Sequence, residues 1–326
     1  MSTEGGNRAV VAALLANTGI AITKFIAFLV ARNSSMLAES IHSVADAGNQ
    51  GLLLLGGRKA KKEATAQHPF GYGRERYLYA FIVAIVLFSI GGLFALYEAY
   101  HKYHEIAAGD AELANGWRRL VPIVVLLVAI VLESFSFRTA IIETNKVKGK
   151  VSFATFVRRA KQPELPVILL EDLAALLGLV FALVGVGMTL ITEDQYWDVA
   201  GTAMIGLLLV TVAIVLAIET KSLLLGESAS LEAQERIAAA ISGTSGIEQL
   251  IHMKTLHLGP EELLVAAKVG VSRGSTAEQV ASAIDEAETA IRTAEPIARA
   301  IYLEPDIHRA DYVPAERPEA PAPTSH

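Results

Sequence analysis

The stretch LAESIHSVADAGNQGLLLLG, residues 37–56, places ionisable side chains in the middle of an apolar sequence. On a helix, spacings of 3, 4 and 3 residues bring one set of polar side chains onto a single stripe, namely Glu39, His42, Asp46 and Asn49. Because charged groups are costly in a bilayer, such a stripe is expected to face the interior of a helix bundle or a water-filled path. The stretch therefore predicts a helical membrane protein with a polar site inside it.

The rest of the chain is also apolar: 52% of the 326 residues are hydrophobic and only 19% are charged. A helix needs about 20 largely apolar residues to cross the hydrocarbon core of a membrane. By this measure we predict six membrane-spanning helices, over residues 9–30, 36–57, 77–100, 120–142, 165–191 and 199–218. Cysteine is absent, which excludes disulfides and thiolate metal sites.

The loops between these segments differ in charge. The connections 58–76 and 143–164 each contain six Lys and Arg residues, whereas the connection TEDQYWD, residues 192–198, is acidic. Since cytoplasmic loops carry the excess of Lys and Arg, both basic loops and both termini are expected in the cytoplasm. The expected location is the cell membrane, either plasma or inner, and the net charge of −6 argues against nucleic acid as a partner.

A second domain is expected after the membrane part. We predict a transmembrane domain at 1–225, a cytosolic α+β domain at 226–308 and a disordered Pro/Ala-rich tail at 309–326. In the cytosolic domain, periodicity and turn signals predict the order αββαβ, with the helices on one face of an antiparallel sheet. This order is that of a ferredoxin-like fold.

The polar stripe carries the chemistry. His42 and Asp46, one helical turn apart, present a nitrogen and an oxygen to one point, as half of a metal site requires. The alternative is a set of hydrogen bonds between helices. Three ionisable groups on one stripe favour metal binding over this alternative. Glu39 lies one turn nearer the outer surface, so we expect it to guide ion or proton release.

The fifth span offers a partner for this stripe, because it contains the adjacent acids Glu171 and Asp172. At about 1.5 Å of helix rise per residue, Asp172 and Asp46 lie at almost the same depth in a core about 30 Å thick. Glu133 of the fourth span is a further acid. It is interpreted as a proton carrier, an accessory ligand or a partner in a hydrogen bond between helices. Lys24 is interpreted either as a side chain that reaches to the membrane surface or as a counter-charge, in both cases outside the site.

Six spans, the sequences SMLAESIHSVADAGNQ (35–50), HPFGYGRERY (68–77) and LLEDLAALLGL (169–179), and a small α+β domain together resemble the cation diffusion facilitator family. Within it, the last two sequences resemble the zinc transporter 9-like branch. The resemblance implies a homodimeric, proton-coupled exporter of Zn²⁺ and related divalent ions.

The resemblance also implies a ligand set. His42, Asp46 and Asp172 match family ligands, but Ile168 stands where the family has the partner of Asp172. The missing ligand is left to one of several alternatives: Glu171, Glu39, Asn49 or water.

We therefore expect a divalent metal efflux transporter that exchanges Zn²⁺ for protons, with Mn²⁺, Fe²⁺ and Co²⁺ as alternative substrates. No resident cofactor and no enzymatic activity are expected, since no HExxH-type motif accompanies the polar stripe. The alternative is a non-transporting regulatory or metal-sensing membrane protein of the same fold. The absence of a metal ligand at Ile168 would then reflect the loss of transport.

Overall fold

The computed structural model describes residues 4–31, 34–109 and 120–307. The chain divides into two compact units. The first comprises Met1–Glu227 together with His257–Glu261, and the second comprises Ser228–Leu256 together with Glu262–His326. The predicted disordered tail, 309–326, lies outside the described residues.

In the first unit, all six apolar segments form helices, as predicted from their length and composition. In chain order they are α1 Glu4–Ala31, α2 Ser34–Lys59, a continuous segment of α3 Glu75–Val86, η1 Leu87–Leu93 and α4 Phe94–Ala108, then α5 Val121–Lys148, α7 Glu164–Thr192 and α8 Tyr196–Leu225. A short helix, α6 Phe153–Arg159, lies between α5 and α7.

Four of these segments are long and apolar enough to cross a membrane: α3–α4, α5, α7 and α8. Within the described residues, α1 contributes a shorter apolar stretch, Val10–Ile26. Helix α2 contains the polar stripe, which lowers its mean hydropathy. A membrane domain is therefore confirmed, while the count of six spans stays a prediction.

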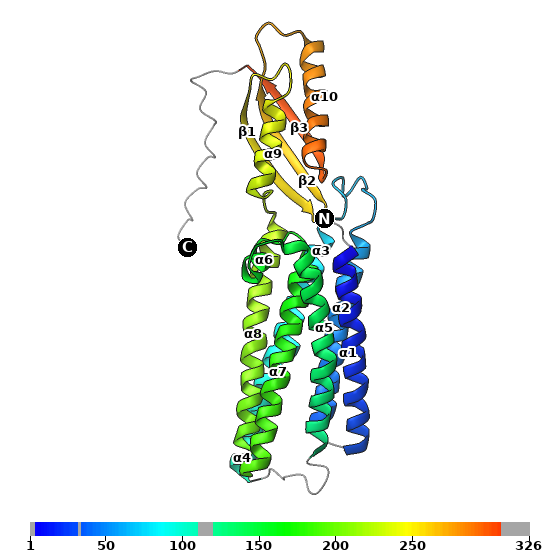
Figure 1. The fold of residues 1–326 in the computed structure, drawn as a ribbon, viewed down its shortest axis with the longest axis vertical. Helices are drawn as coiled ribbons and strands as arrows, with labels where there is room; N and C mark the ends of the chain where they lie inside the picture. The colour runs from blue at the N-terminus through cyan, green and yellow to red at the C-terminus, as the bar shows by residue number, and fades with distance from the viewer. Residues whose placement is uncertain (1–3, 32–33, 110–119, 308–326) are drawn as a thin grey trace, which may run out of the picture. The chain divides into compact units, whose positions relative to one another are not determined.

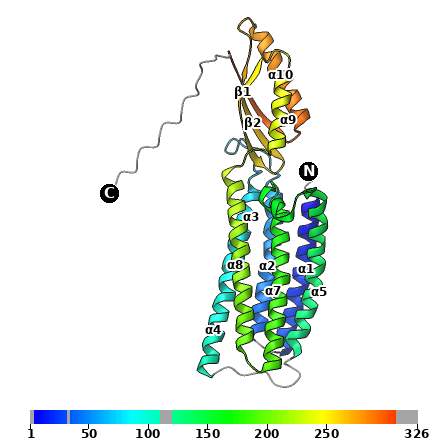
Figure 2. The same ribbon diagram turned by 60° about the vertical axis from the view of Figure 1, so that its left-hand side comes forward.

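The long helices run along one another, as Figures 1 and 2 show. Helix α1 packs against α2 and α5, and α7 packs against α5 and α8. Helices α3 and α4, with η1 between them, pack along α8. This arrangement brings α1, α2, α5 and α7, which carry the predicted polar residues, into one part of the bundle.

Glycine allows close contacts between these helices. A Cβ atom on Gly92 would lie 2.6 Å from Val210 Cγ2, and one on Gly206 would lie 2.7 Å from Leu96 Cγ. Small residues permit such close backbone approach between membrane helices. Gly92 belongs to η1, a segment of π-helix, and π-helical turns are frequent at functional sites.

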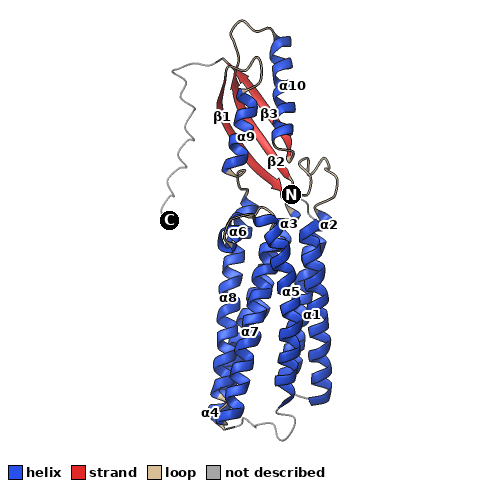
Figure 3. Ribbon diagram, viewed as in Figure 1, coloured by secondary structure: helices blue, strands red, loops and turns tan. Residues whose placement is uncertain are grey.

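The second unit is a small sheet covered by two helices (Figure 3). Its elements are α9 Leu231–Ser242, β1 Gln249–Gly259, of which the last three residues belong to the first unit, β2 Glu262–Gly270, α10 Ala277–Ala294 and β3 Ala298–Asp306. The apolar faces of α9 and α10 pack on the sheet through a core that includes Ile237, Ile241, Val265 and Ile291. The predicted order αββαβ is confirmed.

The prediction of an antiparallel sheet is wrong for its third strand. The strand order is β1-β2-β3, and β2 pairs with β3 in parallel. Helix α10 connects these two strands as a crossover, and a crossover helix returns the chain in the same direction. Only β1 and β2, joined by a tight turn, form a hairpin.

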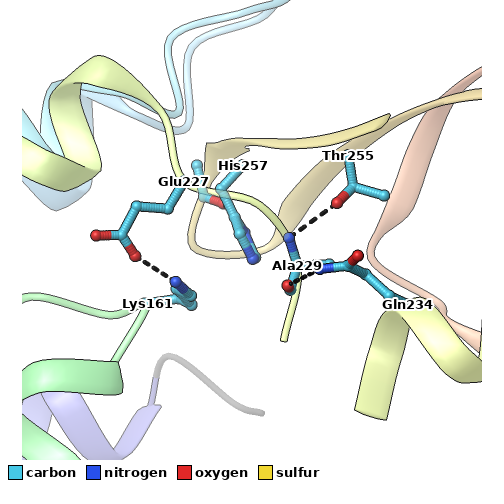
Figure 4. A network of polar contacts seen from close by, with 7 residues as sticks. Lys161, Glu227, Ala229, Gln234, Thr255 and His257 are labelled. Carbon is cyan, nitrogen blue, oxygen red and sulfur yellow. Dashed lines mark hydrogen bonds and ion pairs between the residues drawn. The ribbon is translucent and has the colours of Figure 1, made fainter. Parts of the chain in front are cut away.

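An ion pair lies at the C-terminal end of α8, between Lys161 and Glu227 (Figure 4). Burial by itself would raise the pKa of Glu227, but hydrogen bonds from Lys161 and Ser222 outweigh it and hold that pKa below its ordinary value. The backbone N–H of His257 donates to the Glu227 carbonyl at 2.9 Å.

Candidate metal site

A cavity of about 70 Å³ lies inside the helix bundle, between α1, α2, α5, α7 and α8. Much of its wall is apolar, from small and branched side chains of α5, α7 and α8. Its polar wall consists of Asn17, Lys24, Ser43, Asp46 and Glu133. Polar groups buried in a membrane bundle usually face such an internal space, and they mark ion pathways.

Helix α2 brings the predicted stripe to this cavity. Asp46 lines it, and Ser43, one turn before Asp46, is buried beside it. The side chains of Glu39 and His42 lie outside the described residues, so only their positions on α2 follow from the structure. Since His42 precedes Asp46 by four residues, it lies one helical turn from Asp46 on the same face.

Glu171 is held in place by helix α2. The Asn49 amide donates to its Oε1 at 2.9 Å, and the Gln50 amide donates to its Oε2 at 2.8 Å. All three side chains are buried. Both carboxylate oxygens of Glu171 therefore already accept hydrogen bonds that connect α2 to α7. One of the donors, Asn49, was itself a predicted ligand. Gln50 was not among the predicted site residues.

Asp172 is in a different situation, although it is the next residue along α7. It is 1% exposed, and Ser136 of α5 donates to its Oδ2 at 2.8 Å. Its Oδ1 is buried and has no hydrogen-bond partner among the described residues. Asp172 thus keeps one carboxylate oxygen available for a ligand.

The structure adds two residues to the site, one with several possible roles in the sequence analysis and one placed outside the site there. Glu133 of α5 is 1% exposed and lines the cavity with Asp46. Lys24 of α1 is 4% exposed and lines the same cavity. Lys24 is therefore part of the cavity wall, contrary to its interpretation as a charge outside the site. Both residues are ionisable groups within apolar segments, which is the signal that marks functional positions in membrane helices.

The structure places Ile168, the position that lacks the expected metal ligand, in the hydrophobic core. Ile168, one turn before Asp172 on α7, is fully buried in the main hydrophobic cluster of the first unit. Within the described part of the chain, no three His, Asp or Glu side chains converge closely enough to hold a metal ion. Of the described carboxylates, Asp46 of α2 and Glu133 of α5 line the cavity. A bound cation would have to draw these two and Asp172 of α7 together.

Comparison with known proteins gives this arrangement a context. Residues 10–225 match the family described as the cation efflux transmembrane domain. The human protein named mitochondrial proton-coupled zinc antiporter SLC30A9 is 29% identical over 269 residues, which cover 82% of this chain and 46% of that protein.

Two further relatives come from a plant and a bacterium. Metal tolerance protein C4 of Arabidopsis thaliana is 25% identical over 272 residues, covering 82% of this chain and 58% of that protein. Magnetosome protein MamM of Magnetospirillum gryphiswaldense is 22% identical over 282 residues, which cover 85% of this chain and 81% of that protein. The chain spans about half the length of the human and plant relatives. Because the family model covers residues 10–225, the chain belongs to the cation efflux, or cation diffusion facilitator, family, and it is similar to members of the zinc transporter 9-like branch.

Proposed function

We propose that the chain is a transporter of divalent metal cations and not an enzyme, with Zn²⁺ as its substrate and protons as the counter-ion. The observation that carries this proposal is Oδ1 of buried Asp172, which has no hydrogen-bond partner among the described residues, in a bundle whose cavity is lined by Asp46 and Glu133. Membership of the cation efflux family and the names of the human and plant relatives support it.

The proposed ligands are His42, Asp46 and Asp172. Zn²⁺, like Mn²⁺, Fe²⁺ and Co²⁺, accepts a mixed set of imidazole nitrogen and carboxylate oxygen, whereas Mg²⁺ and Ca²⁺ prefer oxygen alone. Glu171 and Asn49, which bond to each other, act in this proposal by fixing α2 against α7. Glu39 is proposed to guide the leaving ion from its position nearer the outer end of α2.

Antiport follows from competition at these side chains. A metal ion binds neutral imidazole and ionised carboxylates, so protons and metal exclude each other at one site. On the side with the lower pH, protons would displace the metal. On the other side, metal would displace the protons. A pH difference across the membrane would then drive metal in the direction opposite to the protons.

Several features of the whole protein belong to the same proposal. The first unit would cross the membrane six times, and the second would take the ferredoxin-like fold. Both termini would lie on the side of the two basic loops, which is the cytoplasm for a protein of the cell membrane. The chain would work as a homodimer, and a monomeric mass by light scattering in mild detergent would contradict this.

The test is metal uptake into liposomes that contain the purified protein and have an acidic lumen. Zn²⁺ should enter with an initial rate that rises with the pH difference and falls when a protonophore removes it. Mn²⁺, Fe²⁺ and Co²⁺ are compared under the same conditions. Metal binding without uptake would overturn the proposal in favour of a regulatory or metal-sensing membrane protein.

A further inference from the structure

Position 168 poses a problem for the proposed transport site, because it carries an isoleucine. Ile168 is fully buried among apolar side chains, so no ligand on that turn of α7 can complete the set. Glu171, the acid nearest to it in sequence, has both oxygens hydrogen-bonded by Asn49 and Gln50. A further ligand for the metal therefore has to come from another helix.

Helix α5 supplies the side chain that meets this need. Glu133 is 1% exposed, lines the cavity together with Asp46, and interacts electrostatically with Asp172, Asp46 and Glu171. Its Oε1 is buried and has no hydrogen-bond partner among the described residues. A buried carboxylate oxygen without a partner is costly, and such groups in native proteins call for a function.

The neighbouring turn of α5 shows how this carboxylate is aligned. Ser136, three residues after Glu133, donates to Oδ2 of Asp172 and so fixes α5 against α7 at this level. Residues three apart on a helix lie on the same face. Within the described part of the chain, Oε1 of Glu133 and Oδ1 of Asp172 are thus two carboxylate oxygens without a hydrogen-bond partner, on neighbouring helices and about one turn apart.

We propose that Glu133 is a direct ligand of the transported divalent cation and takes the place of the ligand missing at position 168. This inference rests on the proposed function and adds a residue to its site. The donor set would then be one imidazole nitrogen, from His42, and carboxylate oxygens from Asp46, Asp172 and Glu133. With more oxygen donors, the site should accept Mn²⁺ and Fe²⁺ more readily beside Zn²⁺.

Lys24 balances the additional negative charge. It lines the same cavity as Glu133 and Asp46. Three carboxylates and a neutral histidine around a divalent cation leave an excess of one negative charge. An ammonium group at the cavity wall offsets this excess in a medium of low dielectric constant.

The rival role for Glu133 is that of a proton carrier that never touches the metal. The two roles differ in equilibrium metal affinity. Removing a ligand weakens binding at fixed pH, whereas removing a proton carrier changes proton coupling and leaves the metal affinity alone.

The experiment measures Co²⁺ and Zn²⁺ binding to the purified full-length protein by calorimetry, together with the visible absorption spectrum of bound Co²⁺. Glu133→Gln keeps the shape and removes the charge. Since loss of a supporting group around a metal costs about 10–100-fold in affinity, loss of a direct ligand should weaken binding by at least about 100-fold. Glu143→Gln is the matched control, because Glu143 lies on the same helix, is also buried and pairs with Lys146 instead.

Glu133→Asp provides a second readout if Glu133→Gln fails to fold. It keeps the carboxylate but shortens it by one methylene, so a ligand at this position should shift the Co²⁺ spectrum of the folded protein. Unchanged affinity in folded Glu133→Gln, or an unchanged spectrum in Glu133→Asp, overturns the assignment. Unchanged affinity with lost proton coupling does the same and makes Glu133 a proton carrier. If the wild type binds no divalent metal, the proposed function fails as well.

Discussion

The two oxygens of Asp172 have different surroundings, and this difference defines the role of Ser136. The Ser136 hydroxyl holds Oδ2 at 2.8 Å, while Oδ1 remains without a partner among the described residues. Groups that orient a metal-binding side chain commonly contribute about 10–100-fold to metal affinity. Ser136 is therefore a positioning residue for the proposed ligand.

Ser136→Ala should weaken Zn²⁺ binding by about 10–100-fold and leave the fold intact. Ser134→Ala is its control, because the Ser134 hydroxyl is exposed and donates only to the Ile130 carbonyl. Calorimetry on both variants provides the measurement. Equal affinities for Ser136→Ala and the wild type would mean that Asp172 needs no orientation, or that it does not bind the metal.

Glu171→Ala should mainly lower stability. It would leave the buried amides of Asn49 and Gln50 without their acceptor, and each unsatisfied group costs about 1–3 kcal/mol. The unfolding temperature in detergent should fall, while the folded protein should bind Zn²⁺ with nearly wild-type affinity. A large loss of affinity at unchanged stability would instead identify Glu171 as a ligand.

For individual residues, the sequence predicted which side chains face the bundle interior, but not which of them form hydrogen bonds with one another. Spacing on α2 and depth along the helices were enough to predict that Asp46 and Asp172 face the bundle interior. The bonds from Asn49 and Gln50 to Glu171 depend on how α2 and α7 are rotated against each other, which periodicity alone does not specify. Lys24 was set aside because long cationic side chains often reach the membrane surface. In the structure it instead lines the cavity.

Among the elements, α8 and the α3–η1–α4 segment form a close helix contact at Gly92 and Gly206. Gly206→Leu should therefore separate α8 from α4 and destabilise the protein by about 1–3 kcal/mol or more through overpacking. Gly187→Leu is the control, since a Cβ atom on Gly187 meets nothing within 4 Å. Thermal unfolding in detergent compares the two. Equal unfolding temperatures would show that this contact is not tight.

The elements themselves were largely predictable. Long apolar blocks gave the helices, and alternating apolar residues with turn signals gave the strands. The predicted antiparallel pairing of β3 is wrong, because helix α10 connects β2 to β3 as a crossover and so makes the two strands parallel. The π-helical segment Leu87–Leu93 has the apolar composition of an ordinary helix, so no signal in the sequence distinguished it.

For the whole molecule, charge predicts the orientation. The loops 58–76 and 143–164 carry twelve basic residues together, so they should lie on the same side of the membrane. Because the chain has no cysteine, Ala64→Cys and Ala108→Cys each introduce a single thiol at an exposed position. A membrane-impermeant reagent should label Ala108→Cys, but not Ala64→Cys, from outside intact cells. Labelling of Ala64→Cys from outside would reverse the orientation.

The central claim is that Asp46 of α2, which lines the cavity, and the buried Asp172 of α7 carry the metal ion across the membrane. Zn²⁺ flux into proteoliposomes tests it most directly, with Asp46→Asn and Asp172→Asn as the decisive variants and Asp198→Asn as the control. Asp198 pairs with Lys102 away from the cavity, so its variant should transport like the wild type. Each amide keeps the shape of the side chain but removes a charge needed to balance a divalent cation in a low-dielectric interior. We predict flux at the level of protein-free liposomes for both decisive variants. Wild-type flux in a folded Asp46→Asn or Asp172→Asn protein would contradict the claim.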